Sequence, residues 1–332
     1  MRIPRFLSPS SLALFERDRE EYYMKYLAAV RAPRIPQAIY MSIGSAFDAY
    51  VKAELHSAIY GPGSSPEFEF DTIFIEQVEE HNRDWAREHG QYVFDCYKIS
   101  GAYDDLLTML LESEYEPQFE FKVEGEVEGV PLLGKPDCRF VHSNGTHVIL
   151  DWKVNGFCSK HGSSPYKFYA RVRDGWTEET AKKSRGSNKA HPKFDPVDLN
   201  GLQVSGNYLE HASTDWATQL SIYSWMLGEP VGDEGVLMAI DQIVAKPRPG
   251  DQPLLRIAQH RSRISEDYQK SLVQRLKYMW KCVTTGYIFD DMERDENDQR
   301  CAELDQETLS LVGDGTENSE WFTNVCRTTR FH

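Results

Sequence analysis

The sequence that decides the fold is PLLGKPDCRFVHSNGTHVILDWKV, residues 131–154. Two segments of it, residues 131–140 and 146–154, carry the apolar runs that are typical of strands. Just upstream, residues 119–124 alternate apolar with charged side chains, which is the period-two pattern of a half-buried strand. Because the connections are short, neighbouring segments should pair in antiparallel fashion. The sequence therefore predicts three consecutive antiparallel strands in the middle of the chain.

Helical patterns lie on both sides of these strands. Ser8 and Pro9 supply an N-cap and a first-turn proline for the first of them. The predicted helices cover residues 12–27, 43–58, 71–89, 103–113, 215–227 and 265–283, and a further strand covers 235–245. Residues 156–214 are rich in Ser, Gly, Pro, Asn and Lys, which predicts an irregular insertion. The mixture of helices and strands indicates an α/β fold.

The composition is that of a globular chain of 332 residues, of which 40% are hydrophobic. No apolar run approaches the ~18 residues that a membrane span requires, and the first residues lack the apolar centre of a signal peptide. The six cysteines form no Cys-x-x-Cys pair, which argues against a zinc ribbon. We therefore expect a cytoplasmic protein (in the host cytosol if it is of phage origin) with no membrane partner. No Walker-type loop is present, so no nucleotide cofactor is expected.

Charge is distributed unevenly along the chain. The net charge is −15, yet residues 159–193 hold nine Lys or Arg against three Asp or Glu, a local balance of +6 that leaves −21 elsewhere. An acidic surface repels nucleic acid, whereas a basic segment with interleaved aromatic residues can contact phosphates and stack on unpaired bases. The alternative is a solvated loop whose charge only offsets the acidic body. The residues predicted to bind nucleic acid are Lys160, Arg171, Arg173, Lys182, Lys183, Arg185 and Lys189.

Two acidic residues stand on adjacent predicted strands, Asp137 after a turn and Asp151 at the end of an apolar run. Carboxylates brought together repel, and a divalent cation such as Mg²⁺ or Mn²⁺ removes that conflict. Lys153 lies two residues beyond Asp151, so both side chains fall on one face of the strand. An ammonium there can polarise a metal-bound water and stabilise the charge of a reacting phosphodiester. The spacing predicts a hydrolytic metal site.

The competing interpretation is structural, because Asp-x-Lys alone is common and suits a solvated strand end with an ion pair. Gln219 and Tyr223, four residues apart on a predicted helix, share one face and could reach a phosphate or Lys153. Glu120 and Glu124 are further acids near the strands, which we interpret as an exposed strand face.

Five short motifs follow one another along the chain. They are Ser-x-Ser-x-Leu-x-x-Phe (8–15), Ile-Gly-Ser-Ala-Phe-Asp (43–48), Gly-x-x-Asp (134–137), Asp-x-Lys (151–153) and Gln-x-x-x-Tyr (219–223). This ordered set resembles the PD-(D/E)XK nuclease superfamily, in particular the RecB-like branch that includes phage exonucleases. The resemblance covers about residues 8–227. It implies a restriction-endonuclease-like core, in which a central mixed β-sheet is flanked by helices, here with the basic insertion.

The resemblance also implies a role for each matched residue. The predicted catalytic residues are Asp137, Asp151, Lys153, Gln219 and Tyr223, and the predicted metal ligands are Asp48, Asp137, Asp151 and the backbone carbonyl of Trp152. Asp48 stands where this branch usually presents a His, four residues after a Gly. Some members hold an iron–sulfur cluster with a Cys near the N-terminal helix; none stands there in this chain, so no cluster is expected.

These observations predict three consecutive parts: an N-terminal helical part (1–115), a nuclease core with the insertion (116–245), and a C-terminal helical region with an acidic tail (246–332). The predicted function is metal-dependent hydrolysis of DNA phosphodiester bonds by an exonuclease in phage-type recombination or DNA processing, with a recombination or replication protein as a further candidate partner. Two alternatives remain open. One is a catalytically degenerate DNA-binding protein of the same fold, and the other is an acidic interaction protein that blocks a host factor.

Overall fold

The computed structural model describes residues 1–32, 34–154, 195–246 and 254–313. The chain forms two compact units. The first unit consists of Met1–Pro36, Glu124–Gly134 and Lys270–His332, and the second of Gln37–Val123 and Lys135–Gln269. This division differs from the three consecutive parts expected from the sequence, because the N-terminal helices group with the C-terminal ones rather than with the segment that follows them.

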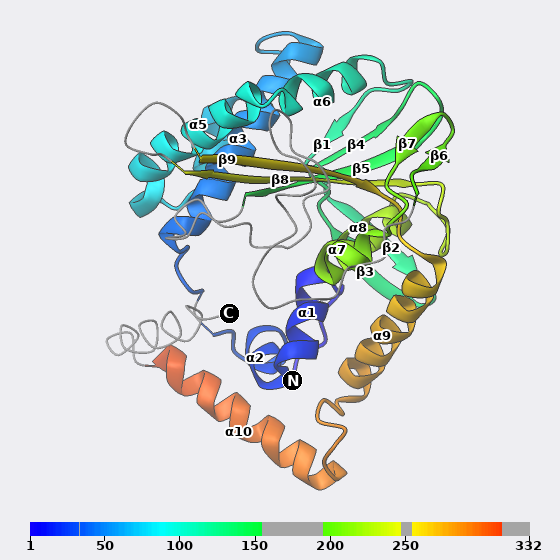
Figure 1. Cartoon of the computed structure of the whole chain (residues 1–332). Helices are drawn as coiled ribbons and strands as arrows, with labels where there is room; N and C mark the ends of the chain where they lie inside the picture. Colours follow the sequence, from blue (N-terminus) through cyan, green and yellow to red (C-terminus); the bar gives the residue numbers. More distant parts are fainter. Residues whose placement is uncertain (33, 155–194, 247–253, 314–332) are drawn as a thin grey trace. The chain divides into compact units, whose positions relative to one another are not determined.

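The second unit is built on a five-stranded sheet (Figure 1). Its strands, in spatial order, are β1 (Gln118–Phe119), β4 (Cys138–Val141), β5 (His147–Val154), β8 (Leu237–Lys246) and β9 (Leu254–Ser262). Strands β5 and β8 are parallel, while the other neighbouring pairs are antiparallel. The predicted α/β class with a central mixed sheet is therefore confirmed, and so is the antiparallel pairing of β4 with β5.

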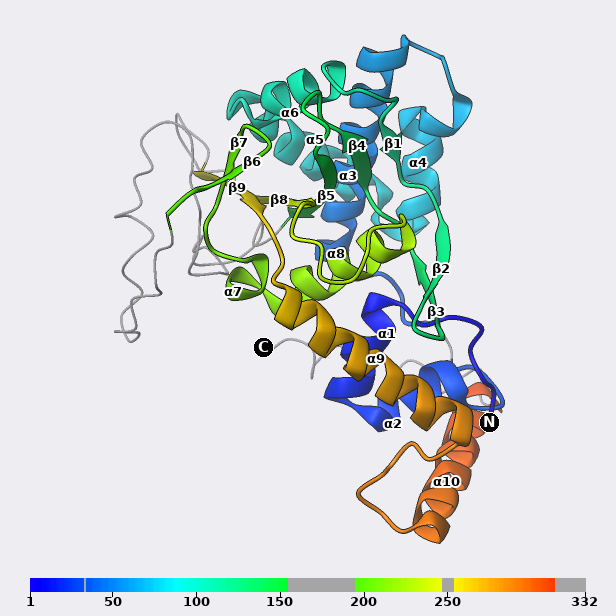
Figure 2. The ribbon, with the colours of Figure 1, turned by 90° about the vertical axis from the view of Figure 1, so that its right-hand side faces the viewer.

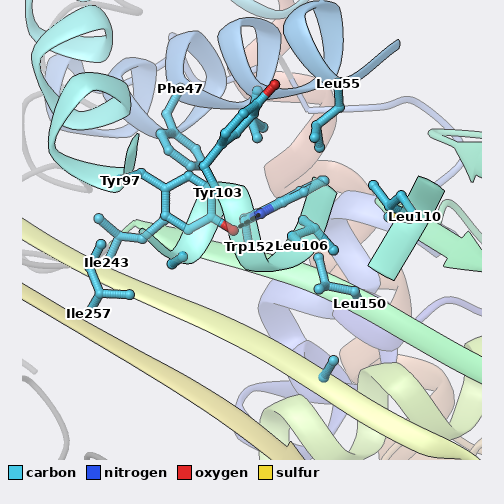
Figure 3. Packing of buried hydrophobic residues seen from close by; sticks show 14 of the residues in the cluster. Phe47, Leu55, Tyr97, Tyr103, Leu106, Leu110, Leu150, Trp152, Ile243 and Ile257 are labelled. Atoms are coloured by element: carbon cyan, nitrogen blue, oxygen red, sulfur yellow. Dashed lines mark hydrogen bonds between the residues drawn. The ribbon is translucent and has the colours of Figure 1, made fainter. Parts of the chain in front are cut away.

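Helices cover both faces of this sheet (Figures 1 and 2). One face carries α3 (Ile39–Tyr60), α5 (Arg83–Ile99) and α6 (Ala102–Leu111), and the other carries α7 (Leu209–Ala212) and α8 (Thr214–Met226). Alternate residues of β5 serve the two layers: Leu150 and Trp152 pack with Tyr97 of α5 (Figure 3), whereas Ile149 packs with Leu220 of α8. Because side chains alternate along a strand, Asp151 and Lys153 belong to the α8 face.

Two predicted strands are each broken into two. The alternating run 119–124 is interrupted at Glu120, whose φ is +44°, so β1 ends before it and β2 (Val123–Val127) begins after it. The run 131–140 contains β3 (Val130–Gly134) and β4, with Pro136 between them; proline lacks the amide hydrogen that a sheet interior needs. Strands β2 and β3 pair with each other in a separate sheet, so this stretch feeds two sheets rather than one.

The helix predicted over 71–89 is also interrupted. It comprises α4 (Phe70–Gln77), a 3₁₀ turn (Glu80–Asn82) and the start of α5, and a second 3₁₀ turn (Pro66–Phe68) precedes it. The predicted insertion is not wholly irregular, because β6 (Val197–Leu199) and β7 (Leu202–Val204) form a two-stranded sheet within it. The region 246–332, predicted as helical, contributes β9 to the main sheet before α9 (Glu266–Thr285) and α10 (Arg294–Gly313).

In the first unit the predicted helix 12–27 consists of α1 (Pro9–Arg17), α2 (Arg19–Tyr22) and a π-helical turn (Tyr23–Leu27). Asp18 has an extended backbone that ends α1, and its side chain caps α2. Ser8 caps α1 as predicted, through a reciprocal pair of hydrogen bonds with Ser11. None of the helices in the described ranges is both long and apolar enough to cross a membrane.

Candidate active site

Two carboxylates meet where β4 begins and β5 ends. The β4–β5 register pairs Cys138 with Leu150, so Asp137, just before β4, lies opposite Asp151. Asp137 is fixed in place because its Oδ2 accepts a hydrogen bond of 3.1 Å from the backbone amide of Trp152. Asp151 is only 2% exposed. The adjacent strands thus hold two acidic groups together, of which Asp151 is almost completely removed from solvent and Asp137 is partly exposed.

Helix α8 links this acidic pair to Lys153. The ammonium of Lys153 contacts the carboxylate of Asp151 and donates a hydrogen bond of 2.9 Å to Oε1 of Gln219. The amide of Gln219 in turn donates to Asp151 Oδ1 at 2.8 Å and to the hydroxyl of Tyr223 at 3.0 Å. Asp151, Lys153, Gln219 and Tyr223 are therefore linked directly to one another, and Asp137, the fifth residue predicted to be catalytic, lies opposite Asp151.

The carboxylates of Asp137 and Asp151 repel each other when both are ionised, and the pKa of each departs from its usual value. Burial and the neighbouring charge of Asp137 raise the pKa of Asp151 to about 7. The pKa of Asp137 is lowered despite its burial, because Lys52 and Lys153 favour its ionised form. Burial alone would lower the pKa of Lys153, but Asp151 and Asp137 outweigh that effect and raise it. Lys153 therefore stays charged, while Asp151 holds a proton up to neutral pH.

On the α3 side, a second group of charges surrounds Lys52. Its side chain is 1% exposed, and its Nζ donates to Asp48 Oδ2 at 2.6 Å, Glu120 Oε2 at 2.9 Å and Asp137 Oδ1 at 3.3 Å. Burial alone would lower the pKa of Lys52, but the three carboxylates raise it. Asp137 accepts from Lys52 through one oxygen and from Trp152 through the other. It therefore joins the two charged groups.

Gln77 completes this second group. Its amide donates to Asp48 Oδ2 and to both oxygens of Glu120, each at 2.9 Å, and Lys135 also contacts Glu120. Burial raises the pKa of Asp48 to about 6 even though Lys52 opposes that change. One oxygen of Asp48, Oδ2, thus accepts hydrogen bonds from both Lys52 and Gln77.

These contacts decide how well a divalent cation fits. Across the residues the structure describes, no three His, Cys, Asp or Glu side chains are grouped so that they could hold a metal ion. The predicted set of Asp48, Asp137 and Asp151 is therefore not ready-made, and each of the three carboxylates is in contact with the ammonium of Lys52 or of Lys153. The pair Asp137 and Asp151 fits one hard cation better: both are oxygen donors, and their repulsion is what a cation would relieve.

Three residues of the site, Glu120, Lys52 and Gln77, are not among the site residues predicted from the sequence. Glu120 was interpreted as part of an exposed strand face, but its side chain is 16% exposed and turns toward Lys52. Its positive φ breaks the strand alternation on which that interpretation relied. Lys52 and Gln77 carried no motif, although the i, i+4 spacing of Asp48 and Lys52 within an apolar helix is a signal for a buried ion pair.

Other predicted residues lie elsewhere. The basic residues 160–189 fall outside the described ranges. In the first unit, Ser8 acts as a helix cap, and Phe15 packs edge-to-face against Tyr22 and Tyr278. The indole of Trp152 is buried in the core beside Tyr97, and its amide rather than its side chain contacts the acidic pair.

A different buried carboxylate, Asp241, lies on β8 opposite Trp152 of β5. It is fully buried, accepts a hydrogen bond of 2.5 Å from the hydroxyl of Tyr97, and lies 2.7 Å from a guanidinium nitrogen of Arg261. Its cationic partner is Arg261, and neither of these two contacts involves a second acidic side chain.

No protein-family model and no curated protein sequence matches the chain. Among solved structures, it is similar to the crystal structure of a "putative exonuclease" from Eubacterium rectale, with a TM-score of 0.41 and 14% identity over 86% of this chain and 88% of that one. It is also similar to the crystal structure of SSO0001, with a TM-score of 0.23 and 11% identity over 85% of this chain and 95% of that one. Such remote likenesses set no function for the chain.

Proposed function

We propose that the chain is a divalent-metal-dependent deoxyribonuclease that hydrolyses DNA phosphodiester bonds, with exonuclease as the leading form and phage-type recombination or DNA processing as its setting. The observation that carries this proposal is the junction of Asp137, Asp151 and Lys153. Two carboxylates from neighbouring strands lie together with a charged lysine, and one helix residue, Gln219, bonds both Asp151 and Lys153. A purely structural ion pair needs only one carboxylate.

Each residue then has a definite task. Asp137 and Asp151 would hold Mg²⁺ or Mn²⁺, which when bound supplies charge neutralisation at the phosphate and acidifies a water molecule. Lys153, whose raised pKa keeps it protonated, would stabilise the negative charge that builds up on the phosphate oxygens. Gln219 would hold Lys153 and Asp151 in their positions relative to each other, and Gln219 itself is hydrogen-bonded to Tyr223.

The proposed DNA binding is supported by the distribution of charge along the sequence. Most of the chain is acidic and would repel a polyanion, so the basic segment 159–193 is the region suited to phosphate contact. Charge-neutralising substitution of Lys182, Lys183 and Arg185 should weaken DNA binding and flatten its dependence on salt concentration.

The test is incubation of labelled linear and covalently closed circular DNA with Mn²⁺, with Mg²⁺ or with EDTA. Metal-dependent loss of linear DNA alone supports the exonuclease, whereas nicking of circles shifts the proposal to an endonuclease. Lys153→Ala is the diagnostic variant, and Lys98→Ala is its matched control because Lys98 is a partly exposed lysine in an ion pair with Glu54. Absence of cleavage by the wild-type chain with either metal would contradict the proposal.

One observation favours a second candidate, a DNA-binding protein of the same fold that no longer cuts. The three carboxylates predicted as metal ligands are each in contact with a lysine, Asp48 and Asp137 with Lys52 and Asp151 with Lys153. This candidate predicts that DNA is retained equally in Mn²⁺ and in EDTA and that no product forms in either.

A further inference from the structure

The first turn of α3 exposes three consecutive large apolar side chains. Ile39, Tyr40 and Met41 are 41%, 63% and 68% exposed. Apolar residues that follow them on the same helix are buried, with Ile43 and Phe47 each 1% exposed. Large apolar side chains that lie together on a protein surface mark sites of interaction. The start of α3 is therefore a candidate surface for a ligand.

This surface continues along α3 into the candidate active site. An α-helix has about 3.6 residues per turn, so Met41, Asp48 and Lys52 share one face of α3. At the far end of this face, Lys52 contacts Asp137. With a rise of about 1.5 Å per residue, Met41 lies about 10 Å from Asp48 along the helix axis. A strand of DNA that reaches Asp137 along this face would pass over the exposed apolar residues.

Gly44 lies between Met41 and Asp48 on α3, and packing does not require a glycine there. A Cβ atom added at Gly44 would meet no neighbouring heavy atom within 4 Å. At Gly90 of α5, by contrast, an added Cβ would lie 2.4 Å from the side chain of Ala46, so that glycine is needed for the two helices to pack. Glycine weakens a helix relative to alanine. At Gly44 it leaves the backbone of α3 open to the close approach of a ligand.

The chemistry of this surface suits unpaired bases. Residues 37–47 contain no charged side chain, in a chain of net charge −15, so DNA meets no acidic group within this segment. The ring of Tyr40 packs edge-to-face against Trp85 of α5, with 5.9 Å between centroids, and Trp85 stacks on His89 at 4.3 Å. Aromatic rings stack on unpaired bases whatever their identity, whereas the bases of a duplex already stack on one another. The ligand that fits is therefore a single strand.

We propose that Tyr40 and Met41 bind the unpaired bases of a DNA end, so that the chain acts on single strands in preference to duplexes. Bases held on these side chains would leave the next phosphates of the strand to reach Asp137 and Asp151. The inference deepens the proposed function, on which it rests, by naming the substrate class. Binding can be measured without cleavage, so the failure of one proposal is distinguishable from the failure of the other.

The first measurement is the affinity of the full chain for a labelled single-stranded oligonucleotide in EDTA, by fluorescence anisotropy. Tyr40→Ala should weaken binding about tenfold, because stacking on an aromatic side chain contributes that much or more per base. Tyr40→Trp keeps an aromatic face and should retain the affinity. Tyr115→Ala is the matched control, since Tyr115 is 64% exposed, and it should bind as the wild type does. Equal affinities of Tyr40→Ala and the wild type, or no binding by the wild type, would overturn the inference.

The dependence of this affinity on salt concentration separates stacking from phosphate contact. Loss of a phosphate contact flattens the dependence, whereas loss of stacking lowers the affinity at every salt concentration alike. Tyr40→Ala should therefore keep the wild-type slope, and a flattened slope would overturn the assignment of Tyr40 to bases.

The second measurement is steady-state cleavage, in Mn²⁺, of the single-stranded oligonucleotide and of the blunt-ended duplex of the same sequence. The wild type should prefer the single strand, and Tyr40→Ala should raise KM for it with little change in kcat. Wild-type preference for the duplex, or an equal rise in KM on both substrates, would overturn the inference. Absence of cleavage contradicts the proposed function alone, and the anisotropy then decides the role of Tyr40. If the wild type is a dimer that Tyr40→Ala dissociates, the surface binds a second copy of the chain, and the inference is overturned.

Discussion

Strands β5 and β8 are parallel neighbours, and each carries a buried aspartate with a different set of partners. Asp241 on β8 is paired with Arg261 and accepts from Tyr97. Asp151 on β5 has Lys153 beside it, but it also faces Asp137, and the pKa of Asp151 is raised to about 7 by burial and by that second acid. A buried carboxylate with its own cation is explained by folding alone. One that faces another acid retains an electrostatic cost, which a bound cation would remove.

The largest effect should come from Asp241→Asn, which leaves Arg261 without its partner in a largely buried position. Breaking such a pair costs about 3–5 kcal/mol of unfolding free energy. Urea unfolding measures it, and Asp71→Asn is the control because that aspartate lies in an exposed ion pair with Arg87 that should contribute about 0–1 kcal/mol. Equal destabilisation by both substitutions would remove the contrast between Asp241 and a surface acid.

Lys153→Ala should have the next largest effect, and on catalysis rather than on stability. Loss of a charge-stabilising donor at the reacting group lowers kcat by about 10²–10³-fold. Cleavage of labelled linear DNA in Mn²⁺ measures it, with Lys98→Ala as the reference. Wild-type cleavage by Lys153→Ala would contradict the role of this lysine.

Gln219→Ala should reduce cleavage less, since Gln219 orients Lys153 and Asp151 without replacing either. Groups that support metal ligands in this way contribute about 10–100-fold. Gln219→Glu tests the polarity of the contact, because a carboxylate can accept from Lys153 but has no N–H to donate to Asp151. If Gln219→Ala matched the loss in Lys153→Ala or had no effect, α8 would not have this supporting role.

The smallest expected effect is a dependence of the affinity for Mn²⁺ on pH. With a pKa of about 7, Asp151 is protonated below neutral pH and must lose that proton when a cation binds. The affinity for Mn²⁺ should therefore rise about tenfold per pH unit up to pH 7 and level off above it. Titrations at several pH values check this, and an affinity that stayed constant between about pH 5.5 and 7 would contradict the coupled proton release.

The half of the site on β5 and α8 was predictable because its geometry is local. The period of two places Asp151 and Lys153 on one face, and the i, i+4 spacing does the same for Gln219 and Tyr223. The half around Lys52 depends on the broken strand at Glu120 and on contacts between residues 68 and 85 positions apart. No local pattern encodes such contacts.

The elements of the fold also divide into those that a local sequence pattern predicts and those that it does not. The antiparallel pair β4–β5 was predicted from short links and apolar runs, whereas β9 was missed. Its residues alternate poorly because polar side chains are buried within the sheet, where His260 on β9 lies 3.3 Å from Gln242 on β8. A polar strand of that kind is indistinguishable from loop or helix by hydrophobic period alone.

Asp137 and Asp151 should bind one divalent cation together. Anomalous diffraction from a crystal soaked in Mn²⁺ shows where such an ion lies. We expect a peak within coordination distance of oxygens from both carboxylates, absent in Asp151→Asn and retained in Lys98→Ala. A peak that touches only one of the two carboxylates, or none near them in the wild type, would contradict it.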